Sequence, residues 1–256
     1  MSNTFDRILS DARALGLREG DTVLVHSSMK SLGITDSPVI VIDALQAAVG
    51  ETGTLLFPAL SFRTVNQETP FFSYHDTPAC IGLLAETFRH QPGVLRSIHP
   101  THSVCARGAR AEELTCDHIL DNTPVGIHSP FRKLPALGGK ILMLGCGMGP
   151  NTFMHGVEEA AEAPYLLLPE PWHYTMEGRE RNRFEVDHFR HGISRYGAQN
   201  YKRAAEILEG DEVRRGNICA AECHLIDTAA LMRKGVEAIH REPFFFLTLH
   251  ENAPAL

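Results

Sequence analysis

The chain has 256 residues, of which 43% are hydrophobic and 21% charged, a composition typical of soluble globular proteins. Its 24 basic and 31 acidic residues give a formal net charge of −7, without a basic arm or stripe, which argues against nucleic-acid binding. No apolar run approaches the roughly 20 residues that would cross a membrane. The length allows one large α/β domain or two small ones, and the acidic balance tolerates a cationic small molecule.

In chain order, the periodicity first predicts a helix at 3–16, a strand at 22–26, a helix at 39–49 ending at Gly50 and a strand at 54–58. A polar loop at 61–78 follows, then a helix at 80–91 and a strand at 99–105. The next elements are a helix at 109–118, a short helix at 129–137 and a strand at 140–145. This strand–helix alternation favours an α/β fold, with a largely parallel or mixed sheet covered by helices on both faces.

The pattern changes after Pro164. Residues 172–191 alternate polar and aromatic side chains, which predicts irregular antiparallel structure facing solvent. A helix at 199–209, a strand at 216–227 and a helix at 228–240 follow. We therefore expect a single domain over residues 1–256, with 165–195 as an inserted subregion on the acceptor side.

Six cysteines are scattered through apolar segments: Cys80, Cys105, Cys116, Cys146, Cys219 and Cys223. The polar N-terminus gives no sign of a secretory leader, so we expect reduced thiols and a cytoplasmic protein. A zinc knuckle of Cys219, Cys223 and His224 is an alternative, but these residues fall in an expected strand and no second close cysteine pair is present.

A glycine-rich turn at 145–149 joins the strand at 140–145 to a helix that Asn151 or Thr152 can cap. On this helix His155 lies three residues before Glu158 and four before Glu159, so a carboxylate can face the imidazole. Ligands of open α/β sheets bind beyond the carboxyl ends of strands, and a histidine oriented there by a carboxylate suits a general base. A packed histidine beside a solvated glutamate is the alternative.

Three further segments carry polar groups. Residues 26–33 end a buried strand with hydroxyls and Lys30, which suits a phosphate, although a serine-rich capping turn explains the segment equally well. His99 and His102 could bind a metal together with His155, but in an extended segment residues three apart point to opposite faces, so shared ligation would require a turn. Ser129-Pro130 has the pattern of a helix start.

Taken in order, these segments resemble the aminoglycoside 3-N-acetyltransferase family, also called the antibiotic N-acetyltransferase family. The similar motifs are Val25-His-Ser-Ser-x-x-Ser-Leu-Gly33, Asp43-Ala-Leu, Val49-Gly, Gly53-Thr-Leu-Leu, Pro58, His99-Pro-x-x-Ser103, Gly126, Ser129-Pro130, Gly139, Leu144-Gly145, Thr152-x-x-His155-x-x-Glu158, Gly216, Ala220 and Leu225-Ile226. The resemblance covers nearly the whole chain.

The resemblance implies acetyl transfer from acetyl-CoA to an amino group of an aminoglycoside, at the 3-N position, on a fold unrelated to the GNAT acetyltransferases and without a metal. It implies His155 as general base and Glu158 as its neighbour. From the chemistry, Thr152 and the backbone N–H groups around 151–154 are expected donors to the thioester oxygen. Residues implied on the CoA side are His26, Ser27, Ser28, Lys30, Ser31, Leu32, Gly33, Ser103, Ser129 and Phe131. Glu185 and Asp187, with Glu159, are implied to bind the amine, although their basic surroundings depart from the family pattern.

Direct transfer in a ternary complex is the preferred mechanism, since a neutral imidazole can accept the amine proton as attack proceeds. Cys146 or Cys105 as an acyl-carrying nucleophile is a second possibility, although both end apolar strands. Another amine metabolite as acceptor, a metal-dependent hydrolase using the 14 histidines, and a non-catalytic CoA-binding protein also stay open. The protein is expected to be a monomer or a homodimer.

Overall fold

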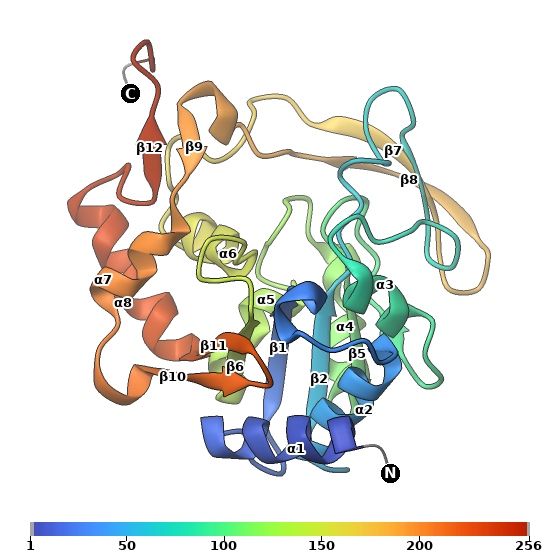
Figure 1. Cartoon of the computed structure of the whole chain (residues 1–256). Coiled ribbons are helices and arrows are strands. Elements are labelled where there is room, and N and C mark those ends of the chain that lie inside the picture. The colour runs from blue at the N-terminus through green and yellow to red at the C-terminus, as the bar shows by residue number, and fades with distance from the viewer. Residues whose placement is uncertain (1–2, 255–256) are drawn as a thin grey trace.

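The computed structural model describes residues 3–254 of the chain. Within that part, a seven-stranded mixed sheet crosses the molecule (Figure 1). Its strands, in spatial order, are β10 (Val213–Ile218), β11 (Ala221–Asp227), β6 (Lys140–Leu144), β1 (Thr22–Ser27), β2 (Thr54–Pro58), β5 (Val104–Gly108) and β4 (Leu95–Arg96). The predicted α/β class with a mixed sheet is confirmed.

The parallel part of this sheet is its centre, where β1 pairs with both β6 and β2 in parallel register. The outer pairs β11–β6, β10–β11, β2–β5 and β4–β5 are antiparallel. Because β1, β2 and β6 run in the same direction, their carboxyl ends meet at one edge of the sheet, where ligands of such folds bind.

Helices cover both faces of the sheet, because successive side chains of each central strand point to opposite sides. Val23 and Val25 of β1 pack in one core cluster, which includes residues of α1 (Asn3–Leu15), α2 (Pro38–Val49) and α3 (Leu83–Arg89). Leu24 packs in the other cluster, which includes residues of α4 (Ala111–Thr115), α5 (Pro130–Lys133), α6 (Phe153–Ala160) and α8 (Thr228–Arg241).

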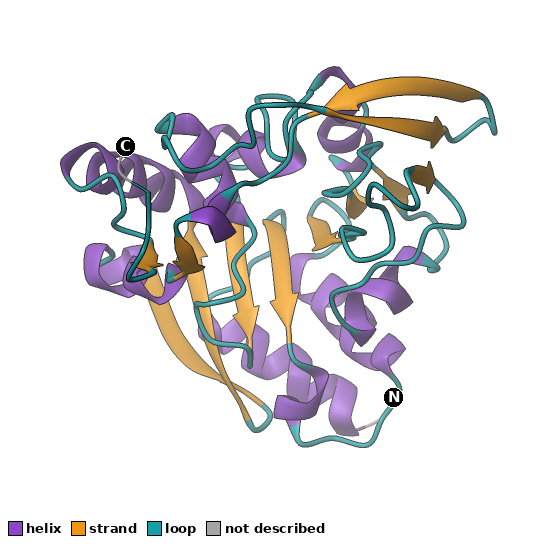
Figure 2. Cartoon of the chain, turned by 90° about the horizontal axis from the view of Figure 1, so that it is seen from above, coloured by secondary structure: helices purple, strands orange, loops and turns teal. Residues whose placement is uncertain are grey.

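Two smaller sheets lie above the carboxyl edge of the main one. A three-stranded sheet joins β3 (Phe71–Ser73) to the antiparallel pair β7 (Trp172–Glu177) and β8 (Arg183–His188), which projects from the body as a long hairpin (Figure 2). The second pairs β9 (Gly197–Gln199) with β12 (Leu247–Leu249), near α7 (Ala204–Ile207) in Figure 1. The antiparallel structure predicted for 172–191 is therefore confirmed.

Three predicted elements were wrong in their extent. The strand expected at 216–227 is the hairpin β10–β11, because Cys219 turns the chain with a φ of 52°. The helix expected at 199–209 is confined to 201–207, since residues 197–199 pair as β9. The strand expected at 99–105 begins only at Val104, and a turn precedes it.

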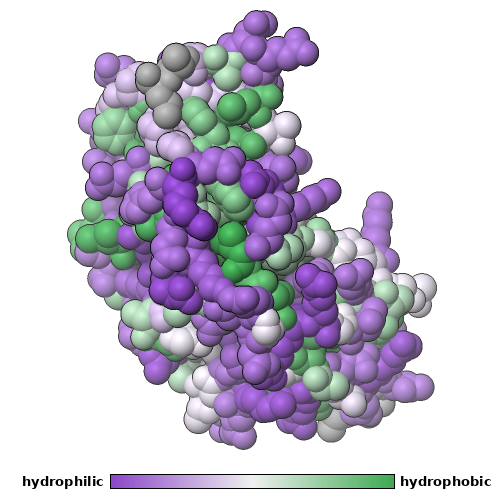
Figure 3. Space-filling view, turned by 90° about the vertical axis from the view of Figure 1, so that its left-hand side faces the viewer, coloured by the Kyte–Doolittle hydropathy of each residue, from purple (hydrophilic) through white to green (hydrophobic). Residues whose placement is uncertain are grey.

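The surface seen in Figure 3 is mostly hydrophilic, with hydrophobic side chains gathered in small patches. None of the helices within residues 3–254 has the length and apolar character that a membrane crossing needs.

Candidate active site

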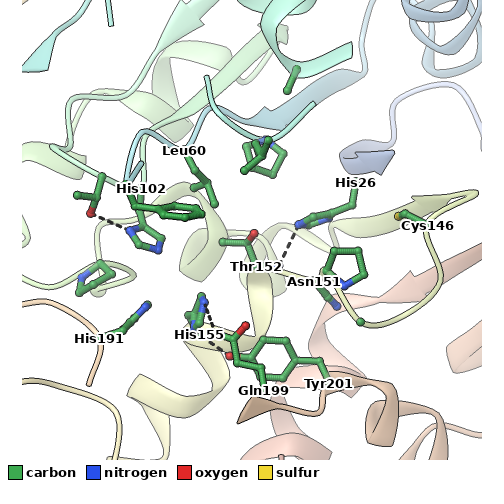
Figure 4. Close-up of a pocket in the computed structure, with 18 of the residues that line it drawn as sticks. His26, Leu60, His102, Cys146, Asn151, Thr152, His155, His191, Gln199 and Tyr201 are labelled. Carbon is green, nitrogen blue, oxygen red and sulfur yellow. Dashed lines mark hydrogen bonds between the residues drawn. The ribbon is translucent and has the colours of Figure 1, made fainter. Parts of the chain in front are cut away.

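A cavity of about 390 Å³ opens at the carboxyl ends of β1, β2 and β6. Its polar lining side chains come from five segments of the chain: His26, Ser27, Thr101, His102, Asn151, Thr152, His155, Arg190, His191, Gln199 and Tyr201. Figure 4 shows most of them pointing toward a common space. This is the edge at which the sequence predicted a site.

The turn between β6 and α6 sets the position of the histidine-bearing helix. Gly145 and Gly147 have φ values of 68° and 64°, conformations that side chains with a Cβ rarely adopt. A Cβ on Gly145 would lie 2.6 Å from the Cβ of Ser31, whose hydroxyl donates to the Gly145 carbonyl at 2.7 Å. Two of the predicted motifs, the serine turn and the glycine turn, are thus in direct contact.

The pairing of His155 with Glu158 predicted from helical spacing is present. Nδ1 of His155 lies 3.1 Å from Oε2 of Glu158, and both side chains are buried. Burial with a carboxylate at Nδ1 places the proton on that nitrogen and leaves Nε2 as the acceptor. The amide nitrogen of Gln199, 3.3 Å from Nε2, can donate to it. Nε2 of His155 is therefore the ring nitrogen on the cavity side that can accept a proton.

Two tyrosines hold the carboxylate from its far side. Tyr165 donates to Oε1 of Glu158 at 2.9 Å, and Tyr201 donates to Oε2 at 2.8 Å. Burial and the adjacent charge of Glu158 raise the pKa of Tyr201 well above its usual value, so the phenol stays a donor. Neither tyrosine could be predicted from local sequence patterns, because 7 and 43 residues separate them from Glu158.

Asn151 and Thr152 lie at the start of α6, on the cavity wall. The backbone N–H of Thr152 donates to Nε2 of His26 at 3.0 Å, and burial lowers the pKa of His26 to about 3, which keeps that imidazole neutral. Thr152 is the N-cap residue of α6, and Oδ1 of Asn151 accepts the N–H of Phe153, the first helical residue. Its Nδ2 is buried and has no hydrogen-bond partner within residues 3–254. An amide donor without a partner therefore lies in the residue that forms this part of the wall.

The predicted CoA-side residues divide into two groups. His26 and Ser27 line the cavity, and Ser28, Lys30, Ser31 and Gly33 follow on the adjoining turn. The other four are buried: Leu32 and Phe131 pack in the core, Ser103 donates to the Ala59 carbonyl, and Ser129 begins α5. Because these four are at most 1% exposed, the structure does not place them at the cavity.

The predicted amine-binding carboxylates also lie away from the cavity wall. Glu185 and Asp187 are on the exposed hairpin strand β8, where His173 contacts them at 3.1 and 2.8 Å. Glu159 accepts bonds from Thr123 and from the Val125 N–H and is buried beneath the wall. The charged side chain that does line the cavity is Arg190, which stacks 4.3 Å over the Trp172 ring.

The alternatives based on cysteine lose support from the geometry. Burial raises the pKa of Cys146 to about 12 and that of Cys105 to about 11, so neither thiol forms the thiolate that a nucleophile requires. Cys105 does not line the cavity, and the cysteines are free thiols.

Comparison with known proteins relates this geometry to a family. A family model described as Aminoglycoside 3-N-acetyltransferase matches residues 24–240. The chain is 34% identical to aminoglycoside N(3)-acetyltransferase VIII of Streptomyces fradiae, covering 92% of this chain and 91% of that protein.

Two solved structures are similar along most of their length. AAC-IIIb, binary with CoASH, has a TM-score of 0.80 and 28% identity, with 96% of this chain and 98% of that chain covered. AAC-VIa bound to sisomicin has a TM-score of 0.75 and 28% identity, with 93% and 97% covered. The chain therefore belongs to the aminoglycoside 3-N-acetyltransferase family.

Proposed function

We propose that this protein transfers an acetyl group from acetyl-CoA to an amino group of an aminoglycoside, at the 3-N position, in a ternary complex. The observation that carries the proposal is the buried pair of His155 and Glu158 at the cavity wall, with Nε2 of His155 as the acceptor. Two similar solved structures are described as a complex with CoASH and a complex with sisomicin, which supports acetyl-CoA and an aminoglycoside as the two substrates.

In the proposed reaction the acceptor binds as the neutral amine, having lost its ammonium proton to solvent, and Nε2 of His155 accepts a proton from the amine nitrogen as that nitrogen attacks the thioester carbonyl. The C–N bond forms, the carbonyl electrons move onto oxygen, and their return breaks the C–S bond. The imidazolium gives its proton to the departing thiolate, which restores the neutral base. Glu158 is a positioning residue that stabilises the imidazolium through Nδ1. General-base assistance of this kind contributes roughly 10²–10⁴-fold.

Negative charge on the carbonyl oxygen needs donors that the ground state leaves unused. The backbone N–H groups of Thr152 and Phe153 are already bonded within the protein. The free Nδ2 of Asn151 is therefore the donor we propose, together with the Thr152 hydroxyl on the same wall. A preorganised donor of this kind contributes about 10²–10³ in kcat.

We place CoA along the turn from His26 to Ser31, with the ammonium of exposed Lys30 available to its phosphates. The segment 165–195, which contributes Arg190 and His191 to the cavity, would then lie on the acceptor side of a single domain. Free cysteines are consistent with action in the cytoplasm.

One observation favours a second acceptor class. Among the described cavity residues the charged group is the cation Arg190, and the carboxylates Glu185 and Asp187 are bonded to His173. A polycation gains little from such a wall, whereas an amine carrying a neutral or acidic group beside its nucleophilic nitrogen would gain a partner in Arg190. Acetylation of such an amine metabolite is the alternative function.

An acceptor panel tests both. Aminoglycosides and amino-group metabolites, neutral and acidic, are incubated with acetyl-CoA, and products are identified by mass spectrometry and the acetyl position by NMR. Acetylation at the 3-amino group of an aminoglycoside supports the main proposal. Turnover confined to amines that carry an acidic group supports the alternative, and absence of turnover with every amine contradicts both.

A further inference from the structure

Three imidazoles converge on the cavity from segments far apart in the chain. His102 lies in the turn before β5, His155 in α6 and His191 after β8. One ring nitrogen of each lies within 4.8 Å of the others. The ring centroids of His155 and His191 are 4.0 Å apart, and those of His102 and His191 are 5.0 Å apart. Figure 4 shows the three rings around one space.

Each ring has one nitrogen that forms no strong hydrogen bond with another protein group. Nδ1 of His102 is 2.8 Å from the Thr101 hydroxyl, which leaves its Nε2 free to bind a ligand. Nε2 of His191 is buried without a hydrogen-bond partner among the described residues, although the Glu159 carboxylate lies 3.9 Å away. Nε2 of His155 meets only the Gln199 amide, at 3.3 Å.

The rings of His102 and His191 are in the protonation state that binds a metal cation. Burial lowers the pKa values of His102 and His191 well below their usual range, so both rings are neutral at physiological pH. A neutral imidazole is the form that ligates metal. The hydrogen bond from Nδ1 of His155 to Glu158 is the carboxylate–histidine contact that commonly supports a metal-ligating histidine.

We infer that His102, His155 and His191 form a binding site for Zn²⁺ or a similar divalent ion that prefers imidazole, and that the bound ion inhibits the enzyme. Three histidines that line one cavity match the three protein ligands of many zinc sites, while the lack of a carboxylate in the triad disfavours magnesium and calcium. Tetrahedral zinc with Zn–N distances of about 2.0–2.1 Å needs nitrogens about 3.4 Å apart. Movements of about 1 Å by the rings would bring the triad from its present spacing to that distance.

The bound ion should inhibit because the lone pair on Nε2 of His155 cannot bind a metal and accept a proton at the same time. In the proposed reaction Nε2 of His155 accepts the proton of the acceptor amine, and a metal ion on the same nitrogen prevents this. The inhibition therefore rests on the proposed function, whereas metal binding by the triad does not.

Equilibrium dialysis of the chelator-treated, full-length protein against ZnCl2 tests binding without any use of activity. We expect one equivalent of zinc, and a dissociation constant raised roughly 10–100-fold or more in His102→Gln and in His191→Gln. His240→Gln is the matched control, because His240 is an exposed histidine on α8. Thermal unfolding of each variant shows whether it is folded. Zinc affinity unchanged by both triad substitutions in folded protein, or no stoichiometric binding by wild type, would overturn the site.

A second measurement tests inhibition. Acetylated product is counted by mass spectrometry rather than by thiol release, since free CoA thiol binds zinc. One equivalent of ZnCl2 should abolish turnover of the wild type, and chelator should restore it. In His191→Gln, the zinc concentration that halves the variant's own rate should rise in step with its dissociation constant. Zinc bound at the triad with no loss of turnover contradicts inhibition. If no amine is acetylated at all, the proposed function fails while the dialysis result still decides the site.

Discussion

The hydroxyl of Tyr201 lies 2.9 Å from Nδ1 of His155 and 2.8 Å from Oε2 of Glu158. One phenol therefore contacts both members of the pair, and Tyr165 fixes the remaining carboxylate oxygen at 2.9 Å. With both oxygens held, Glu158 has little freedom to rotate away from the imidazole. This support comes from a segment more than 40 residues beyond α6 in the chain.

Replacing His155 with Ala should lower kcat by roughly 10²–10⁴-fold, because the general base is lost. Steady-state kinetics with acetyl-CoA and the accepted amine measure the loss, and isothermal titration should show acetyl-CoA binding within a few-fold of wild type. Glu158→Gln should lower kcat less, since the base is retained without its charge partner. A near-wild-type kcat in His155→Ala would remove His155 from the mechanism.

Tyr201→Phe removes one hydroxyl and keeps the ring that packs 6.4 Å from the ring of Phe246. Hydrogen bonds to charged groups contribute about 1.5–3 kcal/mol, so kcat should fall roughly tenfold. Without the phenol, Oε2 of Glu158 loses a donor and the carboxylate is held less firmly beside Nδ1 of His155. Tyr196→Phe, a neighbouring tyrosine that does not contact Glu158, is the control. A kcat of Tyr201→Phe equal to that of this control would show that Tyr201 does not position Glu158.

Asn151→Asp separates two roles of one side chain. The substituted carboxylate still accepts the Phe153 N–H and so keeps the helix cap, but the free Nδ2 donor is gone. We expect kcat to fall by about 10²–10³ with the melting temperature little changed. Thermal unfolding and steady-state kinetics are measured on the same preparation. An unchanged kcat would show that Nδ2 does not stabilise the carbonyl oxygen, and Thr152→Val would then test the hydroxyl.

Stability should fall in mild acid because several buried histidines resist protonation. Burial lowers the pKa values of His26 and His118 to about 3 and that of His188 to about 4, against about 6.5 when unfolded. Between pH 6.5 and these values the unfolded chain binds more protons, so the free energy of unfolding decreases as pH falls. Each such group contributes up to about 1.4 kcal/mol per pH unit.

Urea unfolding at pH 7.5, 6.5 and 5.5 measures this dependence. The midpoint should change little between pH 7.5 and 6.5 and drop clearly by pH 5.5. His118→Gln should be less stable at pH 7.5 but lose less on acidification, whereas the exposed-site control His240→Gln should follow the wild type. Equal midpoints at pH 6.5 and 5.5 would contradict the neutral buried state of these histidines.

Local sequence patterns predicted the structural features that depend on residues close together in the chain. The apolar run of β6, the glycine turn and the i, i+3 spacing of His155 and Glu158 are determined within about 20 residues, and the structure has all three. The helix start at Asn151 or Thr152 was likewise predicted: Thr152 is the N-cap residue, and Oδ1 of Asn151 accepts the Phe153 N–H. Predicted boundaries were wrong where long-range pairing decided them: Gln199, expected to begin a helix, instead pairs with Leu247 in β9.

The sequence by itself determined the fold class, the cavity edge and the pairing of His155 with Glu158, because strand direction and helical periodicity are local properties. Only the tertiary structure decided which residues surround that pair. Tyr201, Gln199 and His191 reach it because the chain returns over the sheet edge after the β7–β8 hairpin, and no periodicity records such a return. The same packing buried Phe131 and Ser103 and bonded Glu159 to Thr123, which motif similarity alone could not show.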